Sequence, residues 1–431
     1  MVLEAGQIDA LIGIKEAYEL PTKLMTRLNN EAEREKMFTA FVDFEPDLSY
    51  DLFTNYFQEG HADRAKFKQD YTPRELCGLI ARLAGDAASY GDICAGSGGL
   101  TIAAWNRNPK AFYFCEEYSA HVLPLLLFNL AIRNMDALVV HGDSLTRETA
   151  AVWRLTPGQR FSSIRALDDR PDIRVDRIIS NPPYSMKWTP VDDERFKGYG
   201  LPPASKADYA FMLHAMNLLR DDGRAVFILP HGVLFRGARE GEIRRTLIKR
   251  GQLEAVIGLP DKLFLNTGIP VCIIEAAKTR RNDGDILFVD ASRDYIKASK
   301  QNALGPEHTS RILAAIRDRA DIPQYAHLAT FEEIEKNGFN LNIPRYVDTF
   351  EPEPLPDLSA LMRDIAGLNQ SIRDTEIELA TMTGQLTGFS TNELEALDAW
   401  QDTLVSKRKT SRNFSTSNAP RTASNTQPAL F

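Results

Sequence analysis

Between Tyr71 and about Ala291, short apolar runs alternate with longer amphipathic runs, and this alternation constrains the fold more than any other feature. Short runs rich in branched and aromatic residues are typical of buried strands, and the longer runs are typical of helices that cover a sheet. The order predicts an α/β fold with a mostly parallel sheet, helices on both faces and an antiparallel strand at the edge among the later strands. The expected strands are Ser89–Ile93, Ala111–Cys115, Leu138–His141, Arg177–Ser180, Arg224–Leu229, Leu253–Leu259, Val271–Ala276 and Ile286–Val289.

The tetrapeptide Asn181-Pro182-Pro183-Tyr184 follows the apolar run Val175–Ile179 and is expected in a loop at the carboxyl end of a strand. Open α/β sheets carry their functional residues at this edge. These side chains can hold a flat NH2 group by its hydrogens and stack an aromatic ring on its plane. The exocyclic amine of adenine is such a group, so the tetrapeptide predicts methylation of a base. The alternative is a structural Pro-Pro loop in which the Asn caps a turn.

A glycine-rich turn from Asp92 to Leu100 follows the first predicted strand and precedes a predicted helix. It contains Gly96, Ser97 and Gly98, and glycines allow positive φ and close approach of a ligand. Dinucleotide-binding enzymes also have such a turn, but their G-x-G-x-x-G spacing differs, and an acid before the turn would repel a pyrophosphate. Asp92 suits a cation instead. S-adenosylmethionine carries a sulfonium and an ammonium group.

Acidic residues also follow the next two predicted strands. Glu117 lies 25 positions after Asp92, near the spacing at which an acid after the second strand binds ribose hydroxyls, and Glu116 is its adjacent competitor. Asp143, in the segment H-G-D-S-L, is placed to reach the adenine amine of a cofactor, although Asp-Ser pairs are also common in turns. These acids predict a nucleoside cofactor site.

The formal net charge of this 431-residue chain is −8, which is unusual for a protein that grips DNA alone, because phosphate contacts need Lys and Arg. Either the basic residues are clustered locally or a partner supplies the grip. The four cysteines and seven histidines lack metal-ligand spacing, so we expect reduced thiols, no metal site and a cytoplasmic protein. No membrane span or signal peptide is visible.

The composition divides the chain into segments. Residues 1–68 predict a small helical N-terminal region, residues 69–291 the cofactor-dependent domain, and residues 292–356 a mixed extension. Residues 357–388 predict a heptad helix. Residues 389–431 predict a largely disordered tail, which is rich in Ser, Thr, Asn and Arg after Ser406.

The heptad segment has one narrow apolar stripe with alternating spacings of three and four. The stripe consists of Leu358, Leu361, Ile365, Leu368, Ile372, Thr375, Leu379, Met382 and Leu386, of which Thr375 is polar. A stripe of about four heptads favours docking on a partner helix. The alternative is an amphipathic helix that lies on its own domain.

Taken together, these residues resemble the methylation (M) subunit of type I restriction–modification systems, within the N6-adenine DNA methyltransferases. The resemblance covers about residues 68–388. Besides the motifs above, it includes the segments Asp208–Phe235, Ile243–Glu275 and Phe339–Tyr346. Two departures stand out. The N-terminal region is shorter than is usual in the family, and Ile93 stands where the family often has proline.

The resemblance implies a Rossmann-like S-adenosylmethionine-dependent methyltransferase sheet and a bacterial or phage-encoded protein. Tyr71-Thr72-Pro73 is similar to an aromatic-Thr-Pro motif that packs over the methionine part of the cofactor. The glycine turn and Asp143 match cofactor-binding positions, and the register of the resemblance favours Glu117 over Glu116. Asn181 to Tyr184 match the catalytic motif, with Asn181 also next to the cofactor.

The expected function is therefore site-specific methylation of N6 of a flipped-out adenine in double-stranded DNA. Only about 60 residues separate the last predicted sheet strand from the heptad helix, which is little room for a recognition domain. We therefore expect a specificity (S) subunit that docks through residues 357–387, with a restriction (R) subunit as a further candidate partner. Alternatives are an orphan or phage-borne adenine methyltransferase, a protein glutamine N5-methyltransferase and a non-catalytic DNA-binding assembly subunit.

Overall fold

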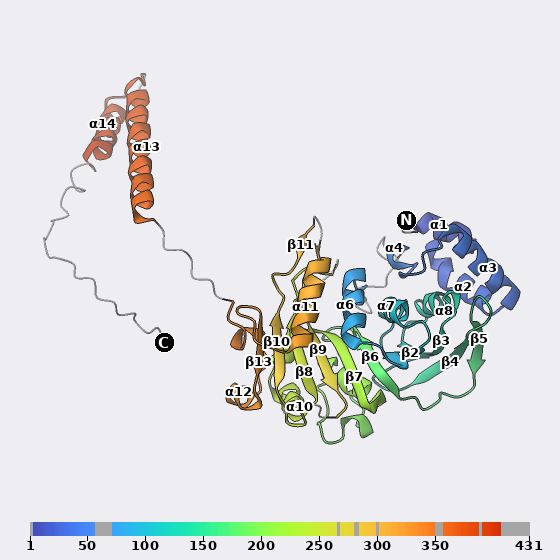
Figure 1. The fold of residues 1–431 in the computed structure, drawn as a ribbon. Helices are drawn as coiled ribbons and strands as arrows, with labels where there is room; N and C mark the ends of the chain where they lie inside the picture. Colours follow the sequence, from blue (N-terminus) through green and yellow to red (C-terminus); the bar gives the residue numbers. More distant parts are fainter. Residues whose placement is uncertain are drawn as a thin grey trace. The chain divides into compact units, whose positions relative to one another are not determined.

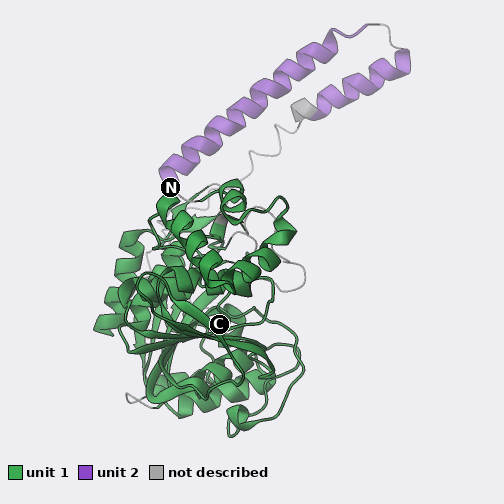
Figure 2. Ribbon diagram, turned by 90° about the vertical axis from the view of Figure 1, so that its right-hand side faces the viewer, with its two compact units in different colours: residues 1–350 green, residues 351–431 purple. Residues whose placement is uncertain are grey.

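The computed structural model describes residues 3–56, 71–264, 268–279, 284–298, 301–349, 357–387 and 390–406. The chain divides into two compact units, residues 1–350 and residues 351–431 (Figure 2). The first unit contains a large sheet covered by helices, and the described part of the second contains two helices.

The first unit is built on an 11-stranded sheet whose centre is mainly parallel (Figure 1). Parallel pairing joins β3, β2, β1, β6 and β7 in that order, and it also joins β8 to β10. These strands are β1 (Ser89–Asp92), β2 (Phe112–Glu117), β3 (Asp136–Gly142), β6 (Val175–Ser180), β7 (Leu219–Pro230), β8 (Leu253–Gly258) and β10 (Ile286–Asp290). The α/β prediction is confirmed, and the carboxyl ends of β1, β2, β3 and β6 lie at one edge.

Antiparallel strands complete the sheet, and one of them is not where the sequence pattern places it. β9 (Val271–Ala277) pairs antiparallel with both β7 and β8, so it lies inside the sheet and not at its edge. β4 (Thr149–Thr156) and β5 (Ser163–Leu167) extend the sheet beyond β3, and β13 (Ala326–Ala329) pairs with β10. The sequence pattern does not predict these three strands, because many of their side chains are exposed and no long apolar run marks them.

Helices cover both faces of the sheet, and successive strand residues face opposite hydrophobic clusters. In β2, Tyr113 and Cys115 belong to one cluster and Phe114 belongs to the other. One face carries α6 (Arg74–Ala84), α7 (Gly99–Arg107), α8 (Leu123–Ile132) and α11 (Pro306–Asp318), and the other carries α9 (Asp208–Leu218) and α10 (Ala238–Lys249) (Figure 1). Shorter elements are α12 (Phe331–Lys336), the hairpin of β11 (Ile296–Lys297) and β12 (Asn302–Ala303), and 3-10 turns at Ala17–Glu19, Glu194–Phe196, His231–Leu234 and Ile343–Arg345.

The N-terminal region is helical over its described residues and shares the core of the sheet. Its helices are α1 (Ala5–Ile12), α2 (Leu20–Leu28), α3 (Glu31–Phe44) and α4 (Thr54–Tyr56). The rings of Phe38, Phe41 and Phe53 pack edge to face around Phe128 of α8, at centroid distances of 5.0, 4.7 and 5.2 Å. These helices therefore belong to the same compact unit as the sheet.

The second unit contains α13 (Leu358–Gly384) and α14 (Thr391–Ser406). Asp357 caps α13 by accepting backbone hydrogen bonds from Ser359 and Ala360 at 2.9 and 3.2 Å. The eight apolar residues of the predicted stripe are 42–68% exposed, so none of them is buried by the described residues. α14 occupies part of the segment for which the sequence predicts a disordered tail from residue 389, so that prediction is wrong for residues 391–406. Residues 407–431 lie outside the described residues.

Among the described residues, none of the helices combines the length and the apolar character needed to cross a membrane.

Candidate active site

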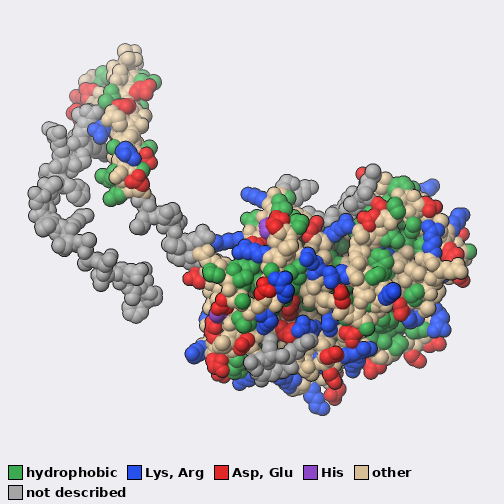
Figure 3. Space-filling model, in the orientation of Figure 1, with side chains coloured by type: hydrophobic (Ala, Val, Ile, Leu, Met, Phe, Trp, Pro, Cys, Tyr) green, Lys and Arg blue, Asp and Glu red, His purple; other side chains and the backbone are tan. Residues whose placement is uncertain are grey.

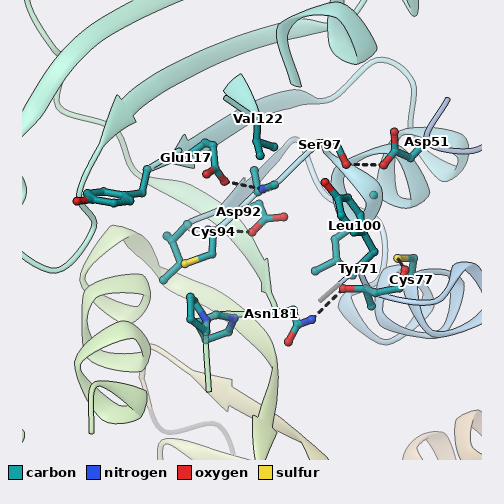
Figure 4. Close-up of a pocket in the computed structure, with 18 of the residues that line it drawn as sticks. Asp51, Tyr71, Cys77, Asp92, Cys94, Ser97, Leu100, Glu117, Val122 and Asn181 are labelled. Carbon is teal, nitrogen blue, oxygen red and sulfur yellow. Dashed lines mark hydrogen bonds between the residues drawn. The ribbon is translucent and has the colours of Figure 1, made fainter. Parts of the chain in front are cut away.

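A cavity of about 930 Å³ opens at the carboxyl edge of β1, β2, β3 and β6 (Figure 4). This volume is at the upper end of the range for ligand pockets. The site residues predicted from the sequence that line it are Tyr71, Thr72, Asp92, Gly96, Ser97, Glu117, Asp143, Asn181, Pro182, Pro183 and Tyr184. Pro73 and Gly98 stand just outside it as the N-cap residues of α6 and α7. The fold therefore brings residues from five separate segments to one place.

The turn between β1 and α7 has a backbone conformation that its glycines allow. Gly96 has a φ of 56° and Gly98 a φ of 101°, in the left-handed region that other residues rarely adopt. A Cβ on Gly98 would also stand 3.1 Å from Cδ1 of Leu126 in α8. At position 98 only glycine combines this backbone conformation with the small space beside Leu126. The turn lies along the wall of the cavity.

Asp92 ends β1 and is buried in the wall of the cavity. Its Oδ1 accepts a hydrogen bond from the backbone N–H of Cys94 at 3.2 Å. Burial and the nearby charges of Glu117 and Glu116 raise the pKa of Asp92 from 3.8 to about 7. A cation in the cavity would favour the ionised carboxylate, so Asp92 suits a positively charged ligand.

Glu117, at the end of β2, faces the cavity. Its Oε2 accepts a hydrogen bond from the backbone N–H of Gly96 at 2.8 Å, and its Oε1 accepts one from that of Ser119 at 2.6 Å. The first bond ties β2 to the glycine turn. Each oxygen of a carboxylate can accept a second hydrogen bond, so Glu117 can also accept bonds from ligand hydroxyls.

Glu116 lies in different surroundings, in a buried polar cluster. The Nε2 atom of His214 lies 2.7 Å from its Oε2, the Ser144 hydroxyl donates to Oε2 at 2.9 Å, and Arg170 pairs with Oε1. Burial opposes ionisation of Glu116, but the charges of His214 and Arg170 outweigh it and lower its pKa to about 2. Of the two adjacent acids, Glu117 is the one that lines the cavity.

Asp143 follows β3 and also lines the cavity. Its Oδ1 accepts a hydrogen bond from the backbone N–H of Leu145 at 2.8 Å, the Asx-turn geometry that the Asp-Ser sequence suggests. The guanidinium of Arg195 fixes the same turn by donating to the carbonyls of Ser144 and Leu145 at 2.7 and 2.6 Å. Asp143 therefore both forms a turn and lines the cavity.

Asn181 follows β6, and both ends of its amide are held. Its Nδ2 donates to Oγ1 of Thr72 at 2.9 Å, and its Oδ1 accepts from the hydroxyl of Tyr184 at 2.7 Å. The ring of Tyr184 contacts the ring of Phe264 edge to face at a centroid distance of 6.1 Å. Thr72, which the resemblance assigns to the cofactor, thus also contacts the tetrapeptide.

The tetrapeptide loop rests on residues that the sequence analysis does not single out. Ser185, next to Tyr184, has a φ of 50°, and its backbone N–H donates to Oδ1 of Asp208 at 2.7 Å. Asp208 is fully buried and pairs with Arg236, which also pairs with Glu240 at 2.9 Å. Because a positive φ outside glycine costs about 1–3 kcal/mol, such a conformation persists only where its surroundings enforce it. The only sequence signal for Asp208 is its place at the start of the Asp208–Phe235 segment.

The cysteines and acids of the cavity do not form a metal site. Within the described ranges, no group of three or more His, Cys, Asp or Glu side chains could hold a metal ion. All four cysteines are free thiols, and Cys77 and Cys94 border the cavity. The groups that line the cavity include carboxylates, the amide of Asn181, aromatic rings and basic side chains such as Arg74 and Lys187.

Comparison with known families matches residues 48–354 to the N-6 DNA Methylase family. The chain belongs to this family. The matched range contains all the site residues predicted from the sequence and every strand of the large sheet. Membership of the N-6 DNA methylases therefore rests on the part of the chain that builds the cavity.

Two curated relatives are methylase subunits of type I restriction enzymes. The MpnII subunit of Mycoplasma pneumoniae is 26% identical over 380 residues, which cover 84% of this chain and 66% of that protein. The MjaVIII subunit of Methanocaldococcus jannaschii is 30% identical over 341 residues, which cover 74% of this chain and 56% of that protein. The chain thus spans less than two thirds of the length of these relatives.

A crystal structure of a type I restriction–modification methyltransferase subunit from Streptococcus thermophilus is also similar. It is 36% identical, with a TM-score of 0.58, and the match covers 65% of this chain and 59% of that one. The α/β sheet described above is therefore shared with a solved structure in this group.

Proposed function

We propose that this N-6 DNA methylase is a site-specific DNA methyltransferase that transfers a methyl group from S-adenosylmethionine to N6 of a flipped-out adenine. It would act as the modification subunit of a type I restriction–modification-like complex. The observation that carries the proposal is the held amide of Asn181 in the same cavity as the buried carboxyl of Asp92. One part of the cavity suits a cation, and another suits an NH2 group.

The donor set of the cavity fits the proposed cofactor. S-adenosylmethionine, when bound, supplies a methyl group on a sulfonium. Asp92 offers negative charge to its cationic part, Glu117 accepts hydrogen bonds from ribose hydroxyls, and Asp143 accepts one from the adenine amine. Tyr71 and Thr72 border the methionine part, and the turn at Gly96 allows close approach of the backbone. In this proposal residues 69–291 form the catalytic domain and residues 292–356 its extension.

The target amine is activated by Asn181 and Pro182. The lone pair of adenine N6 is delocalised into the ring, so the amine is a poor nucleophile. Oδ1 of Asn181 and the carbonyl of Pro182 each accept one N6–H hydrogen bond, which draws the nitrogen toward tetrahedral geometry. Because these acceptors are fixed in advance, most of the acceleration comes from electrostatic placement and orientation. The proton that N6 loses passes to water.

Tyr184 supplies the stacking surface for the flipped base. An adenine that bonds to Oδ1 of Asn181 meets the Tyr184 hydroxyl there, which bonds to that oxygen in this structure, and stacking of the Tyr184 ring on the base moves the hydroxyl away. Pro183 stiffens the loop, and the buried pair of Asp208 and Arg236 anchors its far end.

We further propose that a specificity subunit docks on α13 through residues 357–387 and reads the DNA sequence. The exposed apolar stripe supports this, because stripes of this length mark contacts with another chain. Lys and Arg side chains lie among acidic ones over α6 and α11 (Figure 3), so the chain offers some phosphate contacts despite its net charge of −8. A restriction subunit would be a further partner, and the complex would act in the cytoplasm of a bacterium.

Asn181→Ala tests the assignment, because it removes an acceptor for N6–H and leaves the acids of the cofactor site in place. With radiolabelled S-adenosylmethionine, the wild-type complex should label DNA. The variant should lose about 10²-fold or more in kcat while largely retaining cofactor binding. Comparable transfer by the variant would overturn the assignment. Label in protein instead of DNA would favour methylation of a glutamine amide, which presents the same two hydrogens.

A further inference from the structure

The N-terminal region reaches the wall of the cavity through Asp51, just before α4. Asp51 is buried and lines the cavity beside Ser97 of the glycine turn. Its Oδ2 accepts a hydrogen bond from the Ser97 hydroxyl (Figure 4), and its Oδ1 accepts one from the backbone N–H of Phe53 at 3.0 Å. A residue 46 positions earlier in the chain therefore holds the side chain of the turn.

Asn129 and Arg133, at the end of α8, complete a closed hydrogen-bond circuit. Nδ2 of Asn129 donates to Oδ1 of Asp51 at 2.7 Å and to the carbonyl of Ser97 at 2.8 Å. Arg133 donates to Oδ1 of Asn129 at 3.0 Å, which fixes the orientation of that amide, and it also donates to the backbone carbonyls of residues 48 and 50. All four side chains are at most 6% exposed, so water competes little for these bonds.

We propose that Asp51 is a positioning residue for the cofactor turn, so that the N-terminal region forms part of the S-adenosylmethionine site. The inference rests on the proposed function. Asp51 holds Ser97, which lies between Gly96 and Gly98, the two residues with the greatest backbone freedom. Glu117 holds the N–H of Gly96. Two carboxylates from different parts of the chain therefore clamp the turn.

Burial raises the pKa of Asp51, and the hydrogen bonds of the circuit and the charge of Arg133 oppose this shift. Arg133 lies in the same circuit, and three hydrogen bonds to Asp51 satisfy a carboxylate that would be costly if left unpaired. The carboxylate adds to the negative lining that Asp92 gives the cavity. A helical region that served only as a DNA-binding surface would not need a buried acid against the cofactor turn.

Asp51→Ala, Ser97→Ala and the double variant test the inference, with Asp51→Asn as a variant of nearly the same shape. Titration calorimetry with S-adenosylmethionine and the full chain measures Kd. Methyl transfer to DNA by the complex with its specificity partner measures kcat and KM. The matched control is Asp43→Asn, since the Asp43 side chain is 71% exposed and is not part of the cavity wall.

We expect Asp51→Ala to weaken cofactor binding about tenfold, the effect of losing one charge-assisted hydrogen bond. KM for S-adenosylmethionine should rise by the same factor, while kcat and KM for DNA stay near the wild-type values. Asp51→Asn keeps an oxygen acceptor and should recover part of the loss. Because Asp51 acts through Ser97, the double variant should bind no more weakly than Asp51→Ala alone.

Unchanged cofactor affinity in Asp51→Ala would overturn the inference. A loss of kcat at constant KM would also overturn it, because a smaller folded fraction lowers activity without changing Kd. If Asp51→Ala does not fold, Asp51→Asn and Ser97→Ala decide by the same measurements. A wild-type chain that binds no S-adenosylmethionine overturns the proposed function as well. A wild-type chain that binds it no better than the Asp51 variants overturns the inference alone.

Discussion

The hydroxyl of Tyr184 donates a 2.7 Å hydrogen bond to the amide oxygen of Asn181, the same oxygen that we assign to the target amine. The residue proposed to stack on the base thus occupies the acceptor that the base needs. We expect N6–H to replace this bond when adenine enters and the ring of Tyr184 stacks on the base. The exchange keeps the oxygen paired throughout, which avoids the cost of an unsatisfied acceptor.

Tyr184→Phe keeps the ring and removes the competing hydroxyl. We expect a KM for DNA equal to or below the wild-type value, whereas Tyr184→Ala loses about 1–3 kcal/mol of stacking and should raise KM roughly tenfold or more. Steady-state kinetics on a duplex with the recognition site would separate the two variants. If Phe is as impaired as Ala, the hydroxyl and not the ring is the functional group.

Thr72→Val removes the acceptor for Nδ2 of Asn181 in a side chain of the same shape. We expect kcat to fall about tenfold, for a cost of about 1–2 kcal/mol, because the amide is no longer held in one orientation. Thr72→Ser keeps the hydroxyl and is the control. A rise in KM for S-adenosylmethionine at unchanged kcat would instead place Thr72 with the cofactor.

Cofactor affinity should depend on pH through Asp92, whose pKa burial and the neighbouring acids raise to about 7. A bound cation stabilises the ionised carboxylate, so affinity should rise roughly tenfold between pH 5.5 and 7, as the ionised fraction grows. Asp92→Asn should bind more weakly and with a flatter profile, any residual slope coming from Glu117, whose pKa burial also raises. Calorimetric titrations across this pH range measure the affinity. A wild-type affinity for S-adenosylmethionine that does not change with pH would contradict the role of Asp92.

Glu275 of β9 should make the fold less stable at and above neutral pH than in mild acid. Burial and the charge of Glu254 raise its pKa from 4.5 to about 7, and no described group bonds to its Oε1. Because the folded-state pKa lies above the unfolded one, stability is highest below about pH 4.5 and falls as pH rises to 7.

Glu275→Gln removes this dependence. We expect the variant to be about 2 kcal/mol more stable than the wild type in urea at pH 8, with little difference at pH 5. Glu378→Gln on the exposed surface of α13 is the control. Equal pH profiles for wild type and Glu275→Gln would refute the prediction.

The docking role of α13 predicts that charges in its apolar stripe break the complex and spare the fold. Ile365→Glu with Ile372→Glu should weaken binding of the specificity partner at least tenfold, because charged groups are costly in a buried seam. Since both side chains are about half exposed, the melting temperature of the first unit should not change. Arg363→Glu, outside the stripe, is the control in a size-exclusion assay, and wild-type binding by the double variant would exclude this docking mode.

The sequence predicts the main site because parallel strands end at one edge of the sheet. Tyr71, Asp92, Glu117 and Asn181 are spread over more than a hundred positions, yet all of them line one cavity. Glycine, carboxylate and amide residues after strands can therefore be assigned to a site from order alone.

The sequence pattern does not predict the direction of a strand or the contacts that support the site. The apolar pattern of β9 reports burial and not direction, so its antiparallel place between β7 and β8 could not be read from it. Asp51 resembles an ordinary loop acid, because its partners Ser97 and Asn129 lie 46 and 78 positions away. Asp208 is hidden for the same reason, since Ser185 and Arg236 are distant in the chain.

The most direct test of the central claim is the identity of the methylated atom. Duplex DNA is incubated with S-adenosylmethionine carrying a deuterated methyl group and with this chain in complex with its specificity partner, then digested to nucleosides for mass spectrometry. The account predicts labelled N6-methyldeoxyadenosine with the wild type and almost none with Asn181→Ala. Label on the N4 amine of cytosine, label on protein glutamine, or equal labelling by the variant would contradict it.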